Sequence, residues 1–392
     1  MEMQGLIFLL IYSTQFVGGY DIFSQLYYPS KANTFLEEEI TNDIPRLVSR
    51  YSRYEMRTRF TGNYNGSMYT SHETLGGYEQ ETDNELSYET TVVRSGKRIV
   101  TFVGVEKKKV QKSSMFNQYH NLYKTKQTKI PQKRKQKTKK RRVRRNVYGR
   151  DDRTFIPVNN NFGLKEPYIF TVRISTGCTG ILISPRHVLT AAHCVHDQKD
   201  YVKQTKDLKI GLLKDKSTYE WLGVKNIKLS KGWIEGGQRN GPFYDYALLK
   251  LSRKHRRPYI RISISEEKHH GSGERISFSG FDDDKPTGTM WYRSCTVVED
   301  DRTFLYHYCD AQPGSSGSGV YSWVFDEETG RWERELVGVF SGNRWRTYDE
   351  FYIRVKNFNV AVRLTRYKYA QICKWLGSKM AAKICKDKID RN

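Results

Sequence analysis

Three short motifs carry the residue types that acyl-transfer chemistry requires. His193 lies in the run VLTAAHC, where small neighbours and an adjacent cysteine would hold its imidazole rigidly. Asp245 stands at the head of the apolar stretch YALLKL, and a carboxylate there is costly to bury unless it accepts hydrogen bonds. Ser316 lies in the small-residue turn QPGSSGSG, which would leave a hydroxyl and backbone N–H groups exposed. A histidine, a carboxylate and a serine hydroxyl are residue types that could together carry out nucleophilic catalysis.

Each of these residues, taken alone, has an ordinary structural explanation. His193 could be a packed core histidine, and Asp245 could be a turn or cap residue. Ser315, Ser316 and Ser318 could form a flexible loop. The order and spacing of the three motifs favour the catalytic interpretation. The remaining histidines that were considered lack such context and are expected at the surface: His187, His196, His269 and His270.

The segments around these motifs predict an all-β fold. From residue 146 onward, short apolar runs alternate with turn residues, a pattern typical of antiparallel sandwiches and barrels. The runs cover residues 168–174, 180–184, 208–213, 246–251, 275–281, 319–323 and 336–342. Only residues 368–376, near the C-terminus, have a helical pattern.

The motif TAAHC and the chain order His, Asp, Ser resemble the trypsin-like serine proteases of the chymotrypsin fold. The resemblance covers about residues 146–376. It implies two six-stranded antiparallel β-barrels with a C-terminal helix. It also implies that His193 is the general base, that Asp245 orients it and that Ser316 is the nucleophile. The backbone N–H groups of Gly314 and Ser316 would then form the oxyanion hole.

The same resemblance indicates where a substrate pocket would lie. Asp310 stands six residues before Ser316, the spacing of the pocket-floor aspartate that selects Arg or Lys. Ser341 and Gly342 resemble the strand that pairs with the substrate backbone beside that pocket. However, Gln312 stands where the family has a pocket-bracing cysteine. The loop could therefore run differently and turn Asp310 toward solvent.

One position departs from the family pattern in a way that bears on activation. Ser315 stands where trypsin-like enzymes have the aspartate that pairs with the newly formed N-terminal ammonium. Either other contacts order the site in advance, or activity is weak. The pattern QPGxSGS resembles bacterial glutamyl endopeptidases, which are active without that aspartate. The string CDAQPG, together with a long basic prosegment, resembles a group of secreted animal proteins, the serine protease 23 and serine protease 35 group.

Six cysteines, all after residue 146, fall into three close pairs along the sequence. Close pairs suit local disulfides formed in an oxidising compartment. Zinc binding is the rival interpretation, but the sequence has no C-x-x-C or H-x-x-x-H spacing to support it. We therefore expect three disulfides and no metal or organic cofactor. The expected pairs are Cys178 with Cys194, Cys295 with Cys309, and Cys373 with Cys385.

The N-terminus predicts secretion. Residues 5–12 form the apolar run GLIFLLIY, which resembles the core of a signal peptide covering residues 1–19 and is too short to cross a bilayer. The alternative is a buried strand of the first domain. Asn65 begins the tripeptide NGS, an N-glycosylation acceptor in a secreted chain. We expect an extracellular protein without a membrane span.

A basic linker at residues 107–145 separates a prosegment, residues 20–106, from the protease-like domain at 146–392. Residues 101–145 hold 17 Lys or Arg and one acidic residue, against a net charge of +24 for the whole chain. Arg142 to Arg145 read RVRR, the pattern that furin-like convertases cut, so the mature domain would begin after Arg145. The run could also bind heparin or another matrix polyanion. A nuclear or nucleic-acid role is disfavoured, because secretion is expected and no nucleic-acid-binding module follows.

Two functions remain open from the sequence. The first is a secreted serine endopeptidase, made as a proprotein, that acts on a protein or peptide substrate. The second is a protease scaffold of weak or no activity that binds matrix polyanions. Residues 146–392 show no obvious self-pairing surface, so a monomer is the default expectation.

Overall fold

The computed structural model describes most of the chain from residue 44 onward. The described residues are 44–55, 59–64, 69–72, 83–106, 147–158, 161–214, 218–265, 270–326, 330–347 and 355–385. They lie within one compact unit, Asp43–Asn392. The predicted signal peptide and the basic linker lie outside the described residues.

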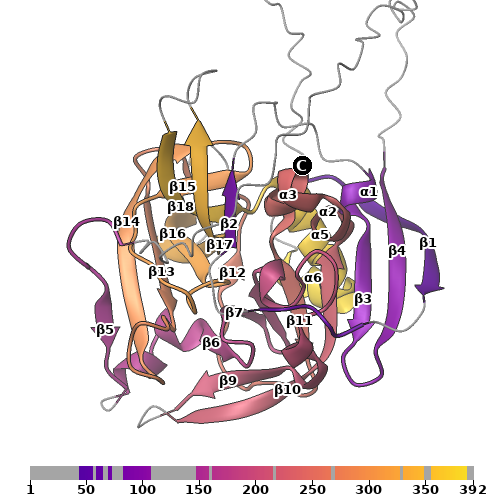
Figure 1. Cartoon of the computed structure of the whole chain (residues 1–392), viewed down its shortest axis with the longest axis horizontal. Coiled ribbons are helices and arrows are strands. Elements are labelled where there is room, and N and C mark those ends of the chain that lie inside the picture. The colour runs from indigo at the N-terminus through magenta and orange to yellow at the C-terminus, as the bar shows by residue number, and fades with distance from the viewer. Residues whose placement is uncertain are drawn as a thin grey trace, which may run out of the picture. The chain divides into compact units, whose positions relative to one another are not determined.

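Six antiparallel strands form the first β-barrel (Figure 1). They follow the order β10–β11–β8–β7–β6–β9, and β9 pairs with β10 to close the barrel. The strands are β6 (Thr171–Ile174), β7 (Thr179–Ser184), β8 (His187–Thr190), β9 (Lys209–Leu213), β10 (Tyr219–Ser230) and β11 (Ala247–Leu251). Each hydrophobic run predicted as a strand in this half of the domain contains a strand, although residues 168–170 of the first run form a 3₁₀ turn instead.

A second closed barrel follows, in the order β17–β16–β13–β14–β15–β18, with β17 paired to β18. Its strands are β13 (Arg275–Gly280), β14 (Met290–Asp300), β15 (Phe304–His307), β16 (Gly319–Asp326), β17 (Arg331–Thr347) and β18 (Val355–Arg363). Short flanking strands are β5 (Thr154–Ile156), on β14, and β12 (Arg261–Ile262), on β17. The predicted pair of six-stranded barrels is confirmed.

Apolar side chains that point into the barrels hold this fold together. In the first barrel, Ile181, Leu189 and Leu249 are at most 1% exposed. In the second barrel, Phe278 and Phe340 are fully buried and stacked, with ring centroids 5.0 Å apart. Burying one such side chain stabilises the folded state by about 1.5–3 kcal/mol.

Helices are few, and the longest is at the predicted place. Helix α5 (Arg366–Leu376) is followed by α6 (Ser378–Ile384), and the Cys373–Cys385 disulfide joins the two segments. The short helices are α1 (Asp83–Leu86), α2 (Lys231–Glu235) and α3 (Gly237–Asn240). The 3₁₀ turns are η1 (Phe162–Leu164), η2 (Tyr168–Phe170), η3 (Ala192–Cys194), η4 (Lys203–Asp207) and η6 (Gly241–Tyr244). Among the described residues, no helix is both long and apolar enough to cross a membrane.

The segment predicted to be a prosegment packs into the same folded unit as the two barrels. Its strands β3 (Tyr88–Val92), β4 (Lys97–Val105) and β1 (Leu47–Glu55) extend the sheet of the first barrel, because β3 pairs antiparallel with β10 (Figure 1). A fourth strand, β2 (Tyr69–His72), pairs parallel with β17 of the second barrel. The sequence indicated β-like stretches in this segment but gave no sign of what they pair with.

Lys228, on β10 beside β3, provides a test of this packing. Its Nζ donates to the Trp375 carbonyl at 2.9 Å and lies 5.2 Å from the centre of the Tyr88 ring. Burial, with Lys250 and Lys374 nearby, lowers the pKa of Lys228 to about 8. A lysine whose folded pKa lies below its unfolded value costs stability while it is charged, and that cost fades as the pH rises through and above 8.

We therefore expect wild type to gain stability relative to Lys228→Met, by about 1–3 kcal/mol, as the pH rises from 7 to 10. Urea unfolding at the two pH values measures this change. Lys199→Met, at an exposed lysine, is the control and should show the same difference from wild type at both. A pH-independent difference for Lys228→Met would contradict the packing described here.

Candidate active site

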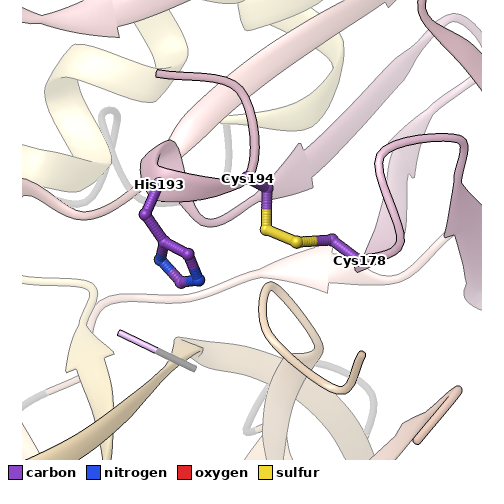
Figure 2. A group of neighbouring side chains, drawn as sticks. All are labelled: Cys178, His193 and Cys194. Carbon is purple, nitrogen blue, oxygen red and sulfur yellow. A yellow bond between two sulfur atoms is a disulfide. The ribbon is translucent and has the colours of Figure 1, made fainter. Parts of the chain in front are cut away.

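His193 is positioned by a short turn and a disulfide. It lies in η3, directly after β8, and the next residue, Cys194, is joined to Cys178 by a disulfide. Figure 2 shows the imidazole projecting from this turn beside the disulfide. The covalent link fixes the turn on which the imidazole is carried, as the sequence had led us to expect.

Asp245 is fully buried and its carboxylate accepts three hydrogen bonds. Its Oδ2 is 2.7 Å from Nδ1 of His193, and its Oδ1 accepts from the His193 backbone N–H at 2.9 Å. The Ser341 hydroxyl donates to Oδ2 at 2.5 Å. With Nδ1 facing the carboxylate, Nε2 is the nitrogen left to exchange protons with a substrate or a nucleophile.

Ser341 was predicted at the substrate-binding strand, and the structure gives its hydroxyl this additional role. The residue lies on β17, in the second barrel, whereas His193 belongs to the first. Asp245 therefore accepts hydrogen bonds from both barrels. No sequence pattern indicated this contact, because nothing local links residue 341 to residue 245.

Ser316 lies in a turn whose shape depends on two glycines. Gly314 has φ +98° and Gly317 has φ +83°, in the left-handed region that favours glycine. A Cβ at Gly314 would lie 2.2 Å from the Phe281 carbonyl oxygen, and one at Gly317 would lie 2.1 Å from Oγ1 of Thr190. The small residues of the motif are therefore required by the turn itself.

The turn that carries Ser316 is hydrogen-bonded to the first barrel through Thr179. This residue was not singled out in the sequence analysis. Its backbone N–H donates to the Ser316 carbonyl at 2.9 Å. Its hydroxyl donates to the Gly314 carbonyl at 2.8 Å and accepts from the Phe281 N–H at 3.1 Å. These bonds hold both ends of the segment that would carry the oxyanion hole.

A buried charge network lies behind the same turn. The Asp282 carboxylate accepts the Gln312 backbone N–H at 3.0 Å. It is paired with the guanidinium groups of Arg153, at 3.1 Å, and Arg293. All three charged residues are at most 6% exposed. Ser315 adds no charge, since its hydroxyl donates to the Gln312 carbonyl at 2.6 Å. The carboxylate that anchors this loop therefore belongs to Asp282 and not to residue 315.

Asp310 is buried and both of its oxygens are occupied by backbone groups. One oxygen accepts the Tyr148 N–H at 2.7 Å and the other accepts the Asp152 N–H at 3.0 Å. The carboxylate therefore holds the start of the protease-like domain and does not face solvent. The assignment of Asp310, Ser341 and Gly342 to a substrate pocket stays a prediction, as do the catalytic and oxyanion-hole roles.

The three predicted disulfide pairs are the three disulfides of the structure: Cys178–Cys194, Cys295–Cys309 and Cys373–Cys385. Two clusters of one histidine and two cysteines have the proximity of metal ligands: Cys178, His193 and Cys194, and Cys295, His307 and Cys309. In both clusters the sulfur atoms are oxidised to a disulfide, and a metal site requires thiolates. These clusters are structural disulfides that lie beside histidines.

The expectation that four other histidines lie at the surface was wrong for three of them. His187, His196 and His270 are at most 4% exposed. Burial lowers the pKa of both His187 and His196 to about 4, with nearby lysines adding to the effect at His187. His187 and His196 are therefore neutral core residues at pH 7. His269 lies outside the described residues, as do Arg142, Arg145, Asn65 and the predicted signal peptide.

Comparisons of the sequence with known proteins agree with the fold. The Trypsin family profile matches residues 158–362. Serine protease 23 of Bos taurus is 42% identical over 259 residues, covering 62% of this chain and 68% of that protein. Inactive serine protease 35 of Homo sapiens is 36% identical over 351 residues, covering 76% of this chain and 79% of that protein. A solved Glu endopeptidase in complex with MPD has a TM-score of 0.46 at 21% identity, covering 59% of this chain and all of that one.

The charge network supplies a prediction about the nucleophile turn. Asp282→Asn leaves two buried guanidinium groups without their shared carboxylate, so the free energy of unfolding should fall by about 3–5 kcal/mol. Asp284→Asn is the matched control, because Asp284 also pairs with Arg153 but its side chain is 40% exposed. The control should cost about 1 kcal/mol or less. Equal losses for the two variants in urea unfolding would show that the network does not depend on Asp282.

Proposed function

Because this chain belongs to the trypsin family, we propose that it is a secreted serine endopeptidase, made as a proprotein and cut after Arg145. The observation that carries the proposal is the buried Asp245 carboxylate, 2.7 Å from Nδ1 of His193, in a domain whose nucleophile turn retains Ser316. Three disulfides support an oxidising, extracellular location.

The proposed chemistry proceeds through an acyl-enzyme. Nε2 of His193 takes the proton of the Ser316 hydroxyl as its oxygen attacks the scissile carbonyl. Asp245 stabilises the imidazolium that forms. The backbone N–H groups of Gly314 and Ser316 stabilise the oxyanion, and His193 then protonates the leaving amine. Water, activated by the same imidazole, releases the acyl group in the second half of the reaction.

Asp282 supports activity despite the absence of a carboxylate at position 315. In the family, that carboxylate orders the oxyanion loop by pairing with the new N-terminal ammonium. Here the Asp282 carboxylate binds the loop at the Gln312 N–H and is neutralised by arginines of the folded domain. The loop therefore has an internal anchor that does not require the new terminus.

Covalent labelling tests the nucleophile. The cleaved wild-type protein should gain one fluorophosphonate adduct by intact mass, whereas Ser316→Ala should gain none, because the attacking oxygen is absent. Ser252→Ala, at an exposed serine, is the control and should be labelled like wild type. An adduct that persists on Ser316→Ala would contradict the assignment of Ser316, and no adduct on any folded, cleaved protein would contradict the endopeptidase proposal.

The alternative function is a protease-fold protein of weak or no activity that binds matrix polyanions. Two observations favour it: the 17 basic residues within 101–145, and the 36% identity to a relative named inactive serine protease 35. Replacing the Lys and Arg residues of 133–141 by Gln should then lower the salt concentration that elutes the uncut protein from heparin. Unchanged elution would remove the polyanion function. The two functions are compatible, since the tract could localise the proprotein until the cut.

A further inference from the structure

We propose that the prosegment stays bound to the protease domain after the cut at Arg145, as a noncovalent chain that places Tyr64 over the nucleophile. This inference rests on the proposed function for its cleavage step. It concerns the residues before 107, whose described parts contact both barrels. Because the prosegment contains no cysteine, no disulfide can retain it, and the attachment must come from noncovalent contacts.

The first contact is a shared sheet. Strand β3 pairs antiparallel with β10 from Tyr88 opposite Ser230 to Val92 opposite Asn226, and β4 and β1 continue the sheet beyond β3. Without the prosegment, β10 would present unpaired backbone groups along this edge. An edge of this kind is a template for strand addition, and here the added strand is the chain's own prosegment.

The second contact is a buried interface with apolar and polar parts. Leu86 is fully buried, and the Tyr88 ring packs edge-on against Trp375 of α5, with centroids 5.9 Å apart. Glu89 is 3% exposed and its carboxylate accepts the Tyr201 hydroxyl at 2.8 Å. This hydrogen bond from Tyr201 to a charged acceptor, in a site closed to water, adds to retention.

Protease-domain side chains also satisfy prosegment carbonyls. Gln371 donates to the Leu86 carbonyl at 2.6 Å, and Ser230 donates to the Glu85 carbonyl at 2.5 Å. Lys374 donates to the Leu47 carbonyl at 2.9 Å. These bonds lie in described residues well away in sequence from Arg145, so cutting the linker there breaks none of them.

A separate stretch, residues 59–64, lies on the loop that follows His193. Gly62 forms a parallel bridge with Val202, and its N–H donates to the Tyr201 carbonyl at 2.9 Å. The Thr61 hydroxyl donates to the Asp200 carboxylate at 2.6 Å. A Cβ at Gly62 would lie 2.7 Å from the Asp200 carbonyl oxygen, so this close approach requires glycine.

These anchors bring Tyr64 into the active site. Its ring centroid is 6.2 Å from that of His193, and its hydroxyl donates to Sγ of Cys178 at 3.2 Å. Burial raises the pKa of the Tyr64 hydroxyl, with Asp283 and Asp245 adding, while Arg173 and the Ser316 hydroxyl act in the opposite sense. In the uncut chain Ser316 is 0% exposed. We infer that the Tyr64 side chain beside it hinders the approach of a substrate carbonyl.

The prosegment also covers the neighbouring strand edge. The backbone of β2 pairs parallel with β17, from Tyr69 opposite Gly342 to His72 opposite Trp345. Gly342 was predicted to pair with the substrate backbone. A peptide that would add to this edge must displace β2, so the bound prosegment competes with substrate at the edge as well as at the nucleophile.

Size-exclusion chromatography tests retention. The secreted full chain is cut with a furin-type convertase and run in native buffer and in 6 M urea. We expect the prosegment and the protease domain to elute together in native buffer and apart in urea, since the bonds between them are noncovalent. Separate elution in native buffer at micromolar concentration would overturn the proposal, whatever the catalytic activity.

Tyrosine nitration by tetranitromethane tests the position of Tyr64 without any need for activity. Tyr54 is the matched control, because it lies in the same prosegment and is 68% exposed. In the cut, native complex Tyr54 should be nitrated and Tyr64 protected, and both should react in urea. Equal nitration in the native complex would show that Tyr64 does not lie in the site.

Labelling rates test the inhibitory role. Tyr64→Ala should raise the fluorophosphonate labelling rate of the cut complex by about tenfold or more, because the blocked state loses its main contact. Tyr54→Ala should leave that rate at the wild-type value. A Tyr64→Ala complex that still coelutes but labels at the wild-type rate would refute inhibition. If no form is labelled, the proposed endopeptidase function fails, whereas coelution and nitration still decide whether the prosegment binds and where Tyr64 lies.

Discussion

A buried carboxylate that needs hydrogen-bond donors on two sides holds this site together. Asp245 is taken out of water, and that is tolerable only because His193 and Ser341 both donate to it. One donor belongs to each barrel, so the barrels must meet in one relative position for the carboxylate to be satisfied. The constraint that stabilises the fold is therefore also the one that sets the tautomer of His193.

The turn that carries Ser316 also depends on a buried carboxylate, that of Asp282. Asp282 binds the backbone at Gln312 and is paired with two arginines, so its charge is compensated within the domain. Removing one partner of such a network costs much more than losing a surface pair. The serine at position 315 is compatible with an ordered turn for this reason: the charge that orders the turn is present, in a different place.

The sequence predicted the local features well and the nonlocal ones poorly. The β-rich pattern and α5 follow from periodicity, the pair of six-stranded barrels from the resemblance to the trypsin family, and the disulfide pairs from close cysteine spacing. The catalytic roles of the three motifs stay predictions. The roles of Thr179, Asp282 and the Ser341 hydroxyl could not be predicted, because each depends on a partner far along the chain. His187 and His196 were wrongly expected at the surface, since a lone histidine gives no local sign of burial. The pairing of β3 with β10 is missed for the same reason: strand register is a property of two segments.

The contacts of the predicted prosegment depend on both local and nonlocal features of the chain. An unpaired edge at β10 is a liability for any secreted β-protein, and the prosegment covers it with three further strands. Residues 59–64 form a second contact, on the loop after His193, where Gly62 fits closely against Asp200. The strand pairing that attaches the prosegment and the segment that carries Tyr64 therefore lie in different parts of the chain. A cut at Arg145 lies outside both, so in the proposed complex Tyr64 stays beside Ser316 after cleavage and slows its reaction until Tyr64 is displaced.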